Sequence, residues 1–262
     1  MFKRFRLQHR GLYNFLSLVV SVAAAFLLWF FISTLPDIGN VIVGPKAVGE
    51  AFIENIRSGY LWIQVRDSLF RVVAGFLLGF VCSIPVAFLL GWYEGFRTIV
   101  EPWIQFLRTI PPIALIPLII ALFGIGTSAK VAIIFFAVFL TMVVTIYQGV
   151  RNVDYTLIKA ARVFDANDRQ IFIHVVVPAT VPYIFTAVRL GIATALTTLV
   201  AAELTGAATG LGMMIQQAGM YFRMDVVLMG IIVIGIIGFI LDKIVLLLER
   251  VLTSWQEVKD NA

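Results

Sequence analysis

The chain contains 262 residues, of which 61% belong to the apolar set AVILMFWYC and 13% are charged. A soluble globular domain has about 45–50% apolar and about 25% charged residues, so this composition excludes a chain whose surface lies mostly in water. The mean hydropathy of +0.99 also argues against disorder. The net charge of +5 is not gathered on a polar face, as nucleic-acid binding would require. A single cysteine excludes a disulfide framework. Because the chain has only two histidines, few side chains are available for a metal site or a Ser-His-Asp triad.

Six stretches are long and apolar enough to cross a membrane, which requires about 20 predominantly apolar residues. The sequence therefore predicts an all-α polytopic membrane protein with about six transmembrane helices. The predicted spans are 12–35, 70–92, 103–123, 130–149, 181–202 and 226–248. We expect a basic N-terminus at 1–11, a single transmembrane domain over 12–250 and a C-terminal tail at 251–262. A cleaved signal peptide is the alternative for the first stretch, but its apolar core is longer than the about 7–15 residues of such peptides.

The positive charges predict the orientation of these spans. The first ten residues contain four lysine or arginine residues and no acid, and the segment 150–180 between spans four and five contains four against three aspartates. The segments 37–67 and 203–225 are poorer in lysine and arginine. Because segments rich in lysine and arginine remain on the cytoplasmic side, we expect both termini and 150–180 in the cytoplasm.

The third span contains three prolines, Pro111, Pro112 and Pro117, which follow Arg108. Each proline removes a backbone donor and clashes with the preceding turn. Broken backbone at membrane depth survives only where protein or a water-filled cavity covers it. We therefore expect this span to line a pathway, and the alternative is a kinked helix packed within a bundle. Gly124 should end the span.

Charged residues inside spans usually face a bundle interior or a cavity, and Arg108, Arg189 and Glu203 are the candidates. Arg189 and Glu203 lie about 21 Å apart along one helix, so each needs a separate partner. Either side chain could instead extend to the headgroups at its own interface. Arg108 could attract an anionic solute or bind carbonyls that the prolines release. We take Arg108, the prolines and Glu203 as candidate pathway residues. After Glu203, a glycine-containing loop and a short amphipathic or re-entrant helix are expected up to residue 222.

The segment 150–180 is too polar to span a membrane and too apolar for a free loop. Apolar residues recur at helical spacing over 155–164. Residues 165–168 are typical of a turn, and Asn167 or Asp168 could cap a second helix.

Pro178 and Pro182 are expected to end the second helix and to direct the chain into the fifth span. A helix, a turn and a helix form a surface suited to docking against another protein. A hairpin lying on the membrane surface is the alternative.

This segment resembles the cytoplasmic loop of the transmembrane subunits of bacterial ABC importers. That loop has the pattern Glu-Ala-Ala, three residues, Gly and then, about a dozen residues later, an apolar residue and Pro. Here Lys159 replaces the Glu, which reverses a charge, and Asp165 replaces the Gly, while Val177 and Pro178 match the end of the pattern. The resemblance implies the type I ABC importer permease fold, with 150–180 as the coupling loop that contacts an ATPase subunit. It assigns this contact to Lys159, Ala160, Ala161, Phe164, Asp165, Ala166, Asn167 and Arg169.

Other motifs resemble the permeases for taurine, aliphatic sulfonates and nitrate or bicarbonate. They are found at 68–76, 107–118, 123–126, 201–204 and 210–212. The resemblance implies a permease of the bacterial inner membrane for a small anion, with taurine or another sulfonate before nitrate or bicarbonate. It also implies that the chain lies in the lipid bilayer and has three protein partners: an ABC ATPase dimer, a second permease copy and an extracytoplasmic substrate-binding protein. A homodimer is favoured over a heterodimer.

The sequence lacks the phosphate-binding pattern G-x-x-x-x-G-K-[ST]. We therefore expect ATP and Mg on the partner ATPase, and neither a catalytic residue, a metal nor a cofactor in this chain. A stand-alone secondary transporter or channel is the alternative, but it would favour inverted repeats and paired acids within spans, which the sequence lacks. An intramembrane enzyme would lack a general base in the spans, since His9 and His174 lie outside them.

Overall fold

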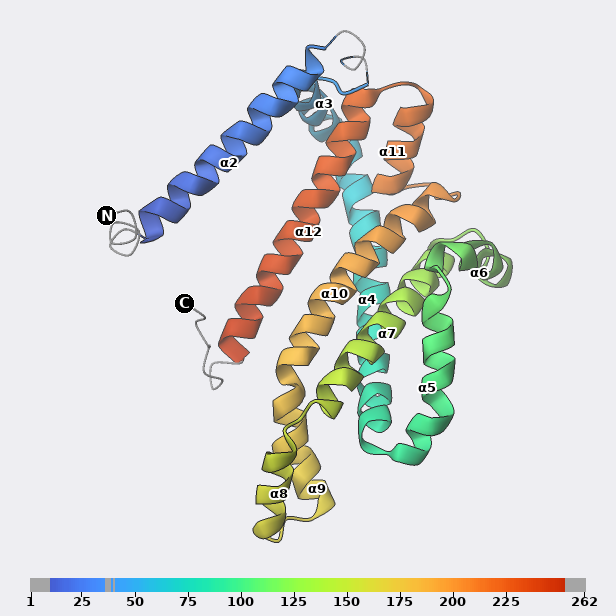
Figure 1. The fold of residues 1–262 in the computed structure, drawn as a ribbon. Coiled ribbons are helices and arrows are strands. Elements are labelled where there is room, and N and C mark those ends of the chain that lie inside the picture. Colours follow the sequence, from blue (N-terminus) through green and yellow to red (C-terminus); the bar gives the residue numbers. More distant parts are fainter. Residues whose placement is uncertain (1–9, 36–38, 40, 253–262) are drawn as a thin grey trace. The chain divides into compact units, whose positions relative to one another are not determined.

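The computed structural model describes residues 10–35, 39 and 41–252. The expected basic N-terminus therefore lies mostly outside the described residues, as does most of the C-terminal tail. Every regular element in the described part is helical (Figure 1), which confirms the all-α class. Contacts divide the chain into two compact units, Met1–Leu61 with Met214–Ile232 and Trp62–Met213 with Val233–Ala262. The single domain expected over 12–250 stays a prediction.

Five helices are long and apolar enough to cross a membrane, and a bent pair of helices could form a sixth crossing. This confirms the prediction of about six spans. The five are α2 (Arg10–Ser33), α4 (Tyr60–Trp92), α7 (Thr127–Arg151), α10 (Val177–Leu204) and α12 (Met224–Leu252).

The predicted third span consists of separate helices. α5 (Glu94–Thr109) ends before Pro111, and a 3₁₀ turn, η1 (Pro112–Leu115), leads into α6 (Ile116–Phe123). The segment Pro112–Phe123 is bent by 90° relative to α5. Ile110 has an extended backbone with ψ of 117°, because a residue that precedes proline is disfavoured in the α region. The break that the prolines predict is therefore present.

In the first unit, α3 (Pro45–Arg57) packs against α2. Trp29 Nε1 donates a hydrogen bond of 3.1 Å to the carbonyl oxygen of Val43, just before α3 begins. The loop and short helix predicted after Glu203 are also present, since α11 covers Leu211–Met220.

The second unit is built around α7, which packs along α10 (Figure 1) and is buried over most of its length. Two glycines of α4, four residues apart, lie against α7. A Cβ atom at Gly75 would be 2.6 Å from Ile134 Cγ2, and one at Gly79 would be 2.8 Å from Val138 Cγ1. Small residues let membrane helices approach closely, so these glycines set the distance between α4 and α7.

The coupling loop contains α8 (Tyr155–Val163) and α9 (Asp168–Ile171), and the second helix does not end where the prolines predicted. α9 continues through a π-helical turn, Phe172–Val176, directly into α10. Pro178 lies in the first turn of α10 and Pro182 lies within that helix. The expectation that they end the helix was therefore wrong. A π turn is wider than an α-helical turn. Here it lies directly before Pro178, where the proline ring would clash with a regular preceding turn.

Replacing Gly79 with leucine should lower the stability of the second unit. The added side chain has no space against Val138, and overpacking costs about 1–3 kcal/mol. The midpoint of thermal unfolding in detergent measures the effect. Gly235→Leu on α12 is the control, because no atom lies within 4 Å of a Cβ placed there. Equal midpoints for the two variants would contradict the packing role of Gly79.

Candidate functional site

The coupling loop is a hairpin whose two helices are both capped by side chains. Asp154 Oδ1 accepts a hydrogen bond of 2.8 Å from the backbone N–H of Thr156, at the start of α8. This bond holds the pKa of the Asp154 carboxyl below its ordinary value. Asn167 caps α9 in a capping box with Gln170, through two hydrogen bonds of 2.9 Å. Of the two caps that the sequence allowed for α9, the structure thus uses Asn167.

The turn between α8 and α9 has the backbone that the family's glycine would give. Asp165 has a φ of +55°, in the left-handed region that Asp enters more readily than most residues. The Arg162 guanidinium pairs with Asp168 across the turn. Asp165 therefore supplies the left-handed backbone of this turn at the position where the family pattern has Gly.

Large apolar side chains are exposed at the end of this hairpin. Phe164 is 85% exposed and Val163 is 81% exposed, whereas Ile158 and Ala161 pack against the core of the second unit. Exposed apolar clusters mark interaction sites. The hairpin is therefore anchored on one side and offers an apolar tip on the other.

The other predicted coupling residues surround this tip. Lys159 and Ala160 are exposed on α8, and the Lys159 Nζ lies 4.8 Å from the centroid of the Tyr155 ring. Ala166 packs against the core. Arg169 is exposed and has no ion pair or hydrogen bond from its side chain to other described residues.

Arg108 lies in the last turn of α5, next to the proline break, and is exposed. It has no side-chain partner among the described residues, so it does not bind the carbonyls that the prolines release. Thr98, Gln105 and Thr109 are exposed on the same helix, at spacings that place them along one face. This face combines polar groups with a free cation. Of the neighbouring prolines, Pro111 and Pro117 are exposed and Pro112 is half-buried.

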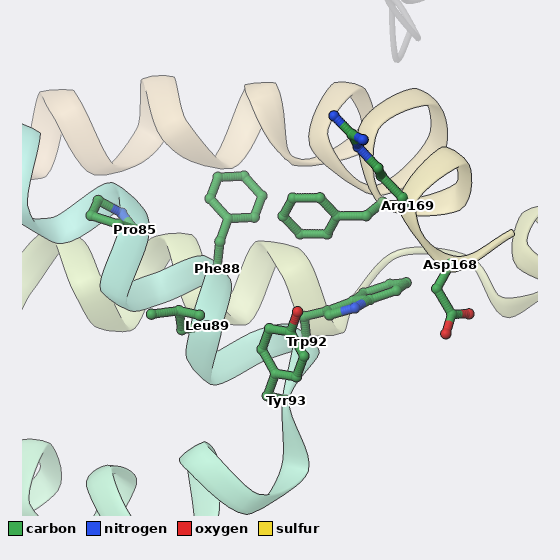
Figure 2. A pocket seen from close by; sticks show the side chains of 8 residues that line it. Pro85, Phe88, Leu89, Trp92, Tyr93, Asp168 and Arg169 are labelled. Atoms are coloured by element: carbon green, nitrogen blue, oxygen red, sulfur yellow. The ribbon is translucent and has the colours of Figure 1, made fainter.

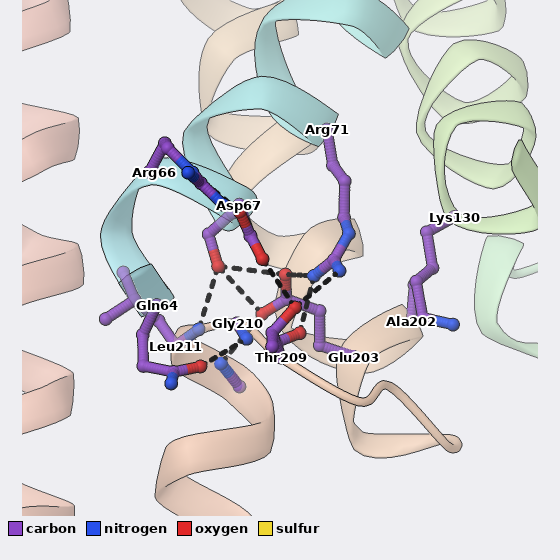
Figure 3. Close-up of polar contacts among 12 residues, drawn as sticks. Gln64, Arg66, Asp67, Arg71, Lys130, Ala202, Glu203, Thr209, Gly210 and Leu211 are labelled. Atoms are coloured by element: carbon purple, nitrogen blue, oxygen red, sulfur yellow. Dashed lines mark hydrogen bonds and ion pairs between the residues drawn. The ribbon is translucent and has the colours of Figure 1, made fainter. Parts of the chain in front are cut away.

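Glu203 is buried inside the protein, whereas the pathway candidate Arg108 is exposed. The Glu203 side chain is fully buried and forms an ion pair with Arg71 of α4, with 2.5 Å between Nη1 and Oε1 (Figure 3). Ser68 Oγ donates to the same carboxylate at 2.8 Å, and the backbone N–H of Gly212 donates at 2.8 Å. The carboxylate thus joins α4, α10 and the first turn of α11.

The loop between α10 and α11 is held by the same residues of α4. Arg71 Nη1 donates to the Thr209 carbonyl oxygen at 2.7 Å, and Gln64 Oε1 accepts from Gly210 N at 2.6 Å. Gly210 has a φ of +126°, and a Cβ atom there would overlap the Glu203 carboxylate. Only glycine fits this position, because of both its conformation and its space.

Sequence reasoning missed Arg71 as the partner of Glu203. The predicted second span began at residue 70, whereas α4 begins at Tyr60 and includes a polar face with Gln64, Ser68 and Arg71. Their spacing of i, i+4 and i+7 is that of one helix face. This polar face within an apolar helix is the signal from which a buried partner could have been predicted.

Arg189 also has a separate partner, as the separation along α10 predicted. Its Nε donates to Asp242 Oδ1 of α12 at 2.8 Å, and both side chains are partly exposed. Within the described residues, no group of three His, Cys, Asp or Glu side chains could hold a metal ion.

Comparison with known proteins identifies the class. Residues 75–254 match the family model "Binding-protein-dependent transport system inner membrane component". The chain belongs to this family, the membrane permease subunits of ABC importers, which are not themselves catalytic.

Similar proteins cover nearly the whole chain. A probable ABC transporter permease of Brucella abortus (strain 2308) is 44% identical over 96% of this chain and 98% of its own. The taurine transport system permease protein TauC of Escherichia coli (strain K12) is 34% identical over 90% of this chain and 88% of its own. Among solved structures, the inward-facing MetNI methionine ABC transporter matches with a TM-score of 0.66 and 22% identity, over 74% of this chain and 96% of that chain. The fold is that of a type I importer permease.

Breaking the buried ion pair should destabilise the protein strongly. Glu203→Ala leaves the Arg71 guanidinium buried without its counter-charge, which costs about 3–5 kcal/mol. Arg66→Gln is the control, since the Arg66 side chain is 77% exposed in its pair with Asp67 and a pair at the surface is worth about 0–1 kcal/mol. The midpoint of thermal unfolding in detergent measures the stability of both variants.

A double variant tests whether the penalty comes from the unpaired charge. Arg71→Met combined with Glu203→Ala should unfold at a higher temperature than Glu203→Ala alone. A double variant less stable than either single variant would contradict this explanation.

Proposed function

We propose that this chain forms the membrane pathway for a small anionic solute and that a separate ATPase subunit drives it through the coupling loop. The exposed apolar tip at Val163 and Phe164 is the observation that carries the proposal. A hairpin that is packed on one side and uncovered on the other is suited to a partner subunit. Since the loop is positively charged, the proposal places it and both chain termini in the cytoplasm of a bacterial cell.

The coupling loop is connected to the membrane helices in two ways. Ile158 and Ala161 pack against the same core as α7, and the π turn Phe172–Val176 continues into α10. A displacement of the loop when the ATPase subunits close on ATP would therefore act on α7 and α10 together. Two copies of the chain would enclose the pathway, and an extracytoplasmic binding protein would deliver the solute.

The solute class follows from Arg108. A free guanidinium beside a broken helix attracts an anion strongly where water is scarce, and it can hold a sulfonate or carboxylate with two hydrogen bonds. The similarity to a taurine permease supports taurine or another sulfonate as the solute. Nitrate and bicarbonate are the next candidates.

Phe164→Asp should weaken the complex with the ATPase subunit. A central aromatic residue of an interface contributes about 2 kcal/mol or more, so the affinity should fall about thirtyfold. Affinity purification of the tagged chain from its native membrane, with identification and quantification of the bound ATPase, measures this. Phe222→Asp is the control, because Phe222 is 83% exposed and belongs to a segment predicted on the opposite side of the membrane. Equal recovery of the ATPase with both variants would overturn the docking role.

Arg108→Gln should raise the KM for the anionic solute about tenfold, because one charge-assisted hydrogen bond is worth about 1.5–3 kcal/mol. Arg108→Lys should retain part of the affinity. Uptake of labelled taurine, an alkanesulfonate and nitrate by the reconstituted complex measures the effect. Arg97→Gln is the control, since Arg97 lies on the same helix but pairs with Glu94 at 3.4 Å.

Two outcomes separate the parts of the proposal. Unchanged KM values in Arg108→Gln would remove the anion role and leave the permease role standing. A complex that transports without any bound ATPase would overturn the coupling mechanism itself.

A further inference from the structure

A second uncovered feature is an apolar groove where the end of α4 meets the coupling loop. Its cavity has a volume of about 540 Å³. Figure 2 shows Phe88, Leu89 and Trp92 of α4, and Tyr93 just after it, on one side and Arg169 of α9 on the other. Phe172 closes one wall, with its ring centroid 5.5 Å from that of Phe88 and 5.3 Å from that of Trp92.

The groove continues an exposed apolar stripe of α4. Exposed apolar side chains follow one another at every fourth position, at Val73, Leu77 and Val81. The next two members of this series, Pro85 and Leu89, line the groove. Successive members of this series are displaced by about 40° around the helix, so Val81, Pro85 and Leu89 form a short stripe along which a hydrocarbon chain would lead into the groove.

The residues at the end of α4 mark the membrane boundary. Trp92 and Tyr93 follow a long apolar helix and precede the charged Glu94, and tryptophan and tyrosine gather at the level of the lipid headgroups. The coupling loop lies beyond this level. The groove therefore opens where an acyl chain ends and a headgroup begins.

The charge at the groove is positive and unbalanced. Arg169 has no side-chain partner among the described residues. The neighbouring carboxylate, Asp168, is paired with Arg162 and so does not neutralise it. A free guanidinium beside an apolar cavity matches the two parts of an anionic phospholipid, which basic pockets on the cytoplasmic side of membrane proteins bind.

We propose that this groove binds an anionic phospholipid, with the phosphate on Arg169 and one acyl chain along Leu89, Pro85 and Val81. The proposal rests on the proposed function only for the cytoplasmic placement of the coupling loop. Because Phe172 begins the π turn that joins the coupling loop to α10, the bound lipid supports the contact between the loop and α4.

Brominated phospholipids test the proposal through the fluorescence of Trp92. The full chain, with any ATPase subunit that co-purifies, is placed in nanodiscs containing brominated phosphatidylglycerol or brominated phosphatidylcholine. The contribution of Trp92 is the difference between wild type and Trp92→Phe. We expect half-quenching at a mole fraction about fivefold lower for phosphatidylglycerol, the preference that one basic residue at the membrane surface gives.

The variants identify the charge responsible. Arg169→Gln should abolish the preference for phosphatidylglycerol, and Arg169→Lys should keep it. Lys243→Gln is the control, because Lys243 is an exposed cation near the end of α12 and does not line the groove. An equal response to both lipids, or a preference that persists in Arg169→Gln, would overturn the proposal. So would a Trp92 that neither lipid quenches, which would mean that protein covers the groove.

Native mass spectrometry of the wild-type chain gives a second measurement that needs no variant. Phosphatidylglycerol should remain bound at collision energies that remove phosphatidylcholine. Neither measurement depends on transport. A failure of lipid binding therefore leaves the permease function intact, and a failure of transport leaves the lipid result intact.

Discussion

The ion pair between Arg71 and Glu203 holds together the elements around which the second unit is arranged. One carboxylate accepts hydrogen bonds from the Arg71 guanidinium, the Ser68 hydroxyl and the backbone of Gly212. Away from water, neither charge could be left without a partner, because an isolated buried ion costs several kcal/mol. The pair therefore fixes which faces of α4 and α10 meet, and it brings the loop before α11 to the same place.

Two ion pairs between helices neutralise four of the charges of this chain. Glu203 and Arg71 neutralise each other, as do Arg189 and Asp242, and both pairs join helices that are distant in sequence. Arg108 and Arg169 have no such partner among the described residues. Arg108 and Arg169 are therefore available to bind an anionic solute and an anionic lipid from outside the chain, as proposed above.

The sequence predicted those features that depend on neighbouring residues. Apolar length located the spans, the prolines after Arg108 located the broken helix, and Asn167 was a foreseen cap. The partner of Glu203 was not predictable in this way, because Arg71 lies 132 positions away and sequence spacing carries no information on such contacts. The prediction that Pro178 ends a helix was wrong for another reason. A proline interrupts a regular helix but is tolerated after a π turn.

The π turn Phe172–Val176 also makes the effect of a deletion depend on where it falls. A π turn contains one residue more than the α-helical turn that it replaces. Removing one residue from it would restore a regular helix and leave the coupling loop close to its present direction, but the ring of Pro178 would then meet the carbonyl four residues earlier. Removing one residue from the regular part of α10 would instead rotate the coupling loop by about 100° around the helix axis and carry its apolar tip away from its present direction.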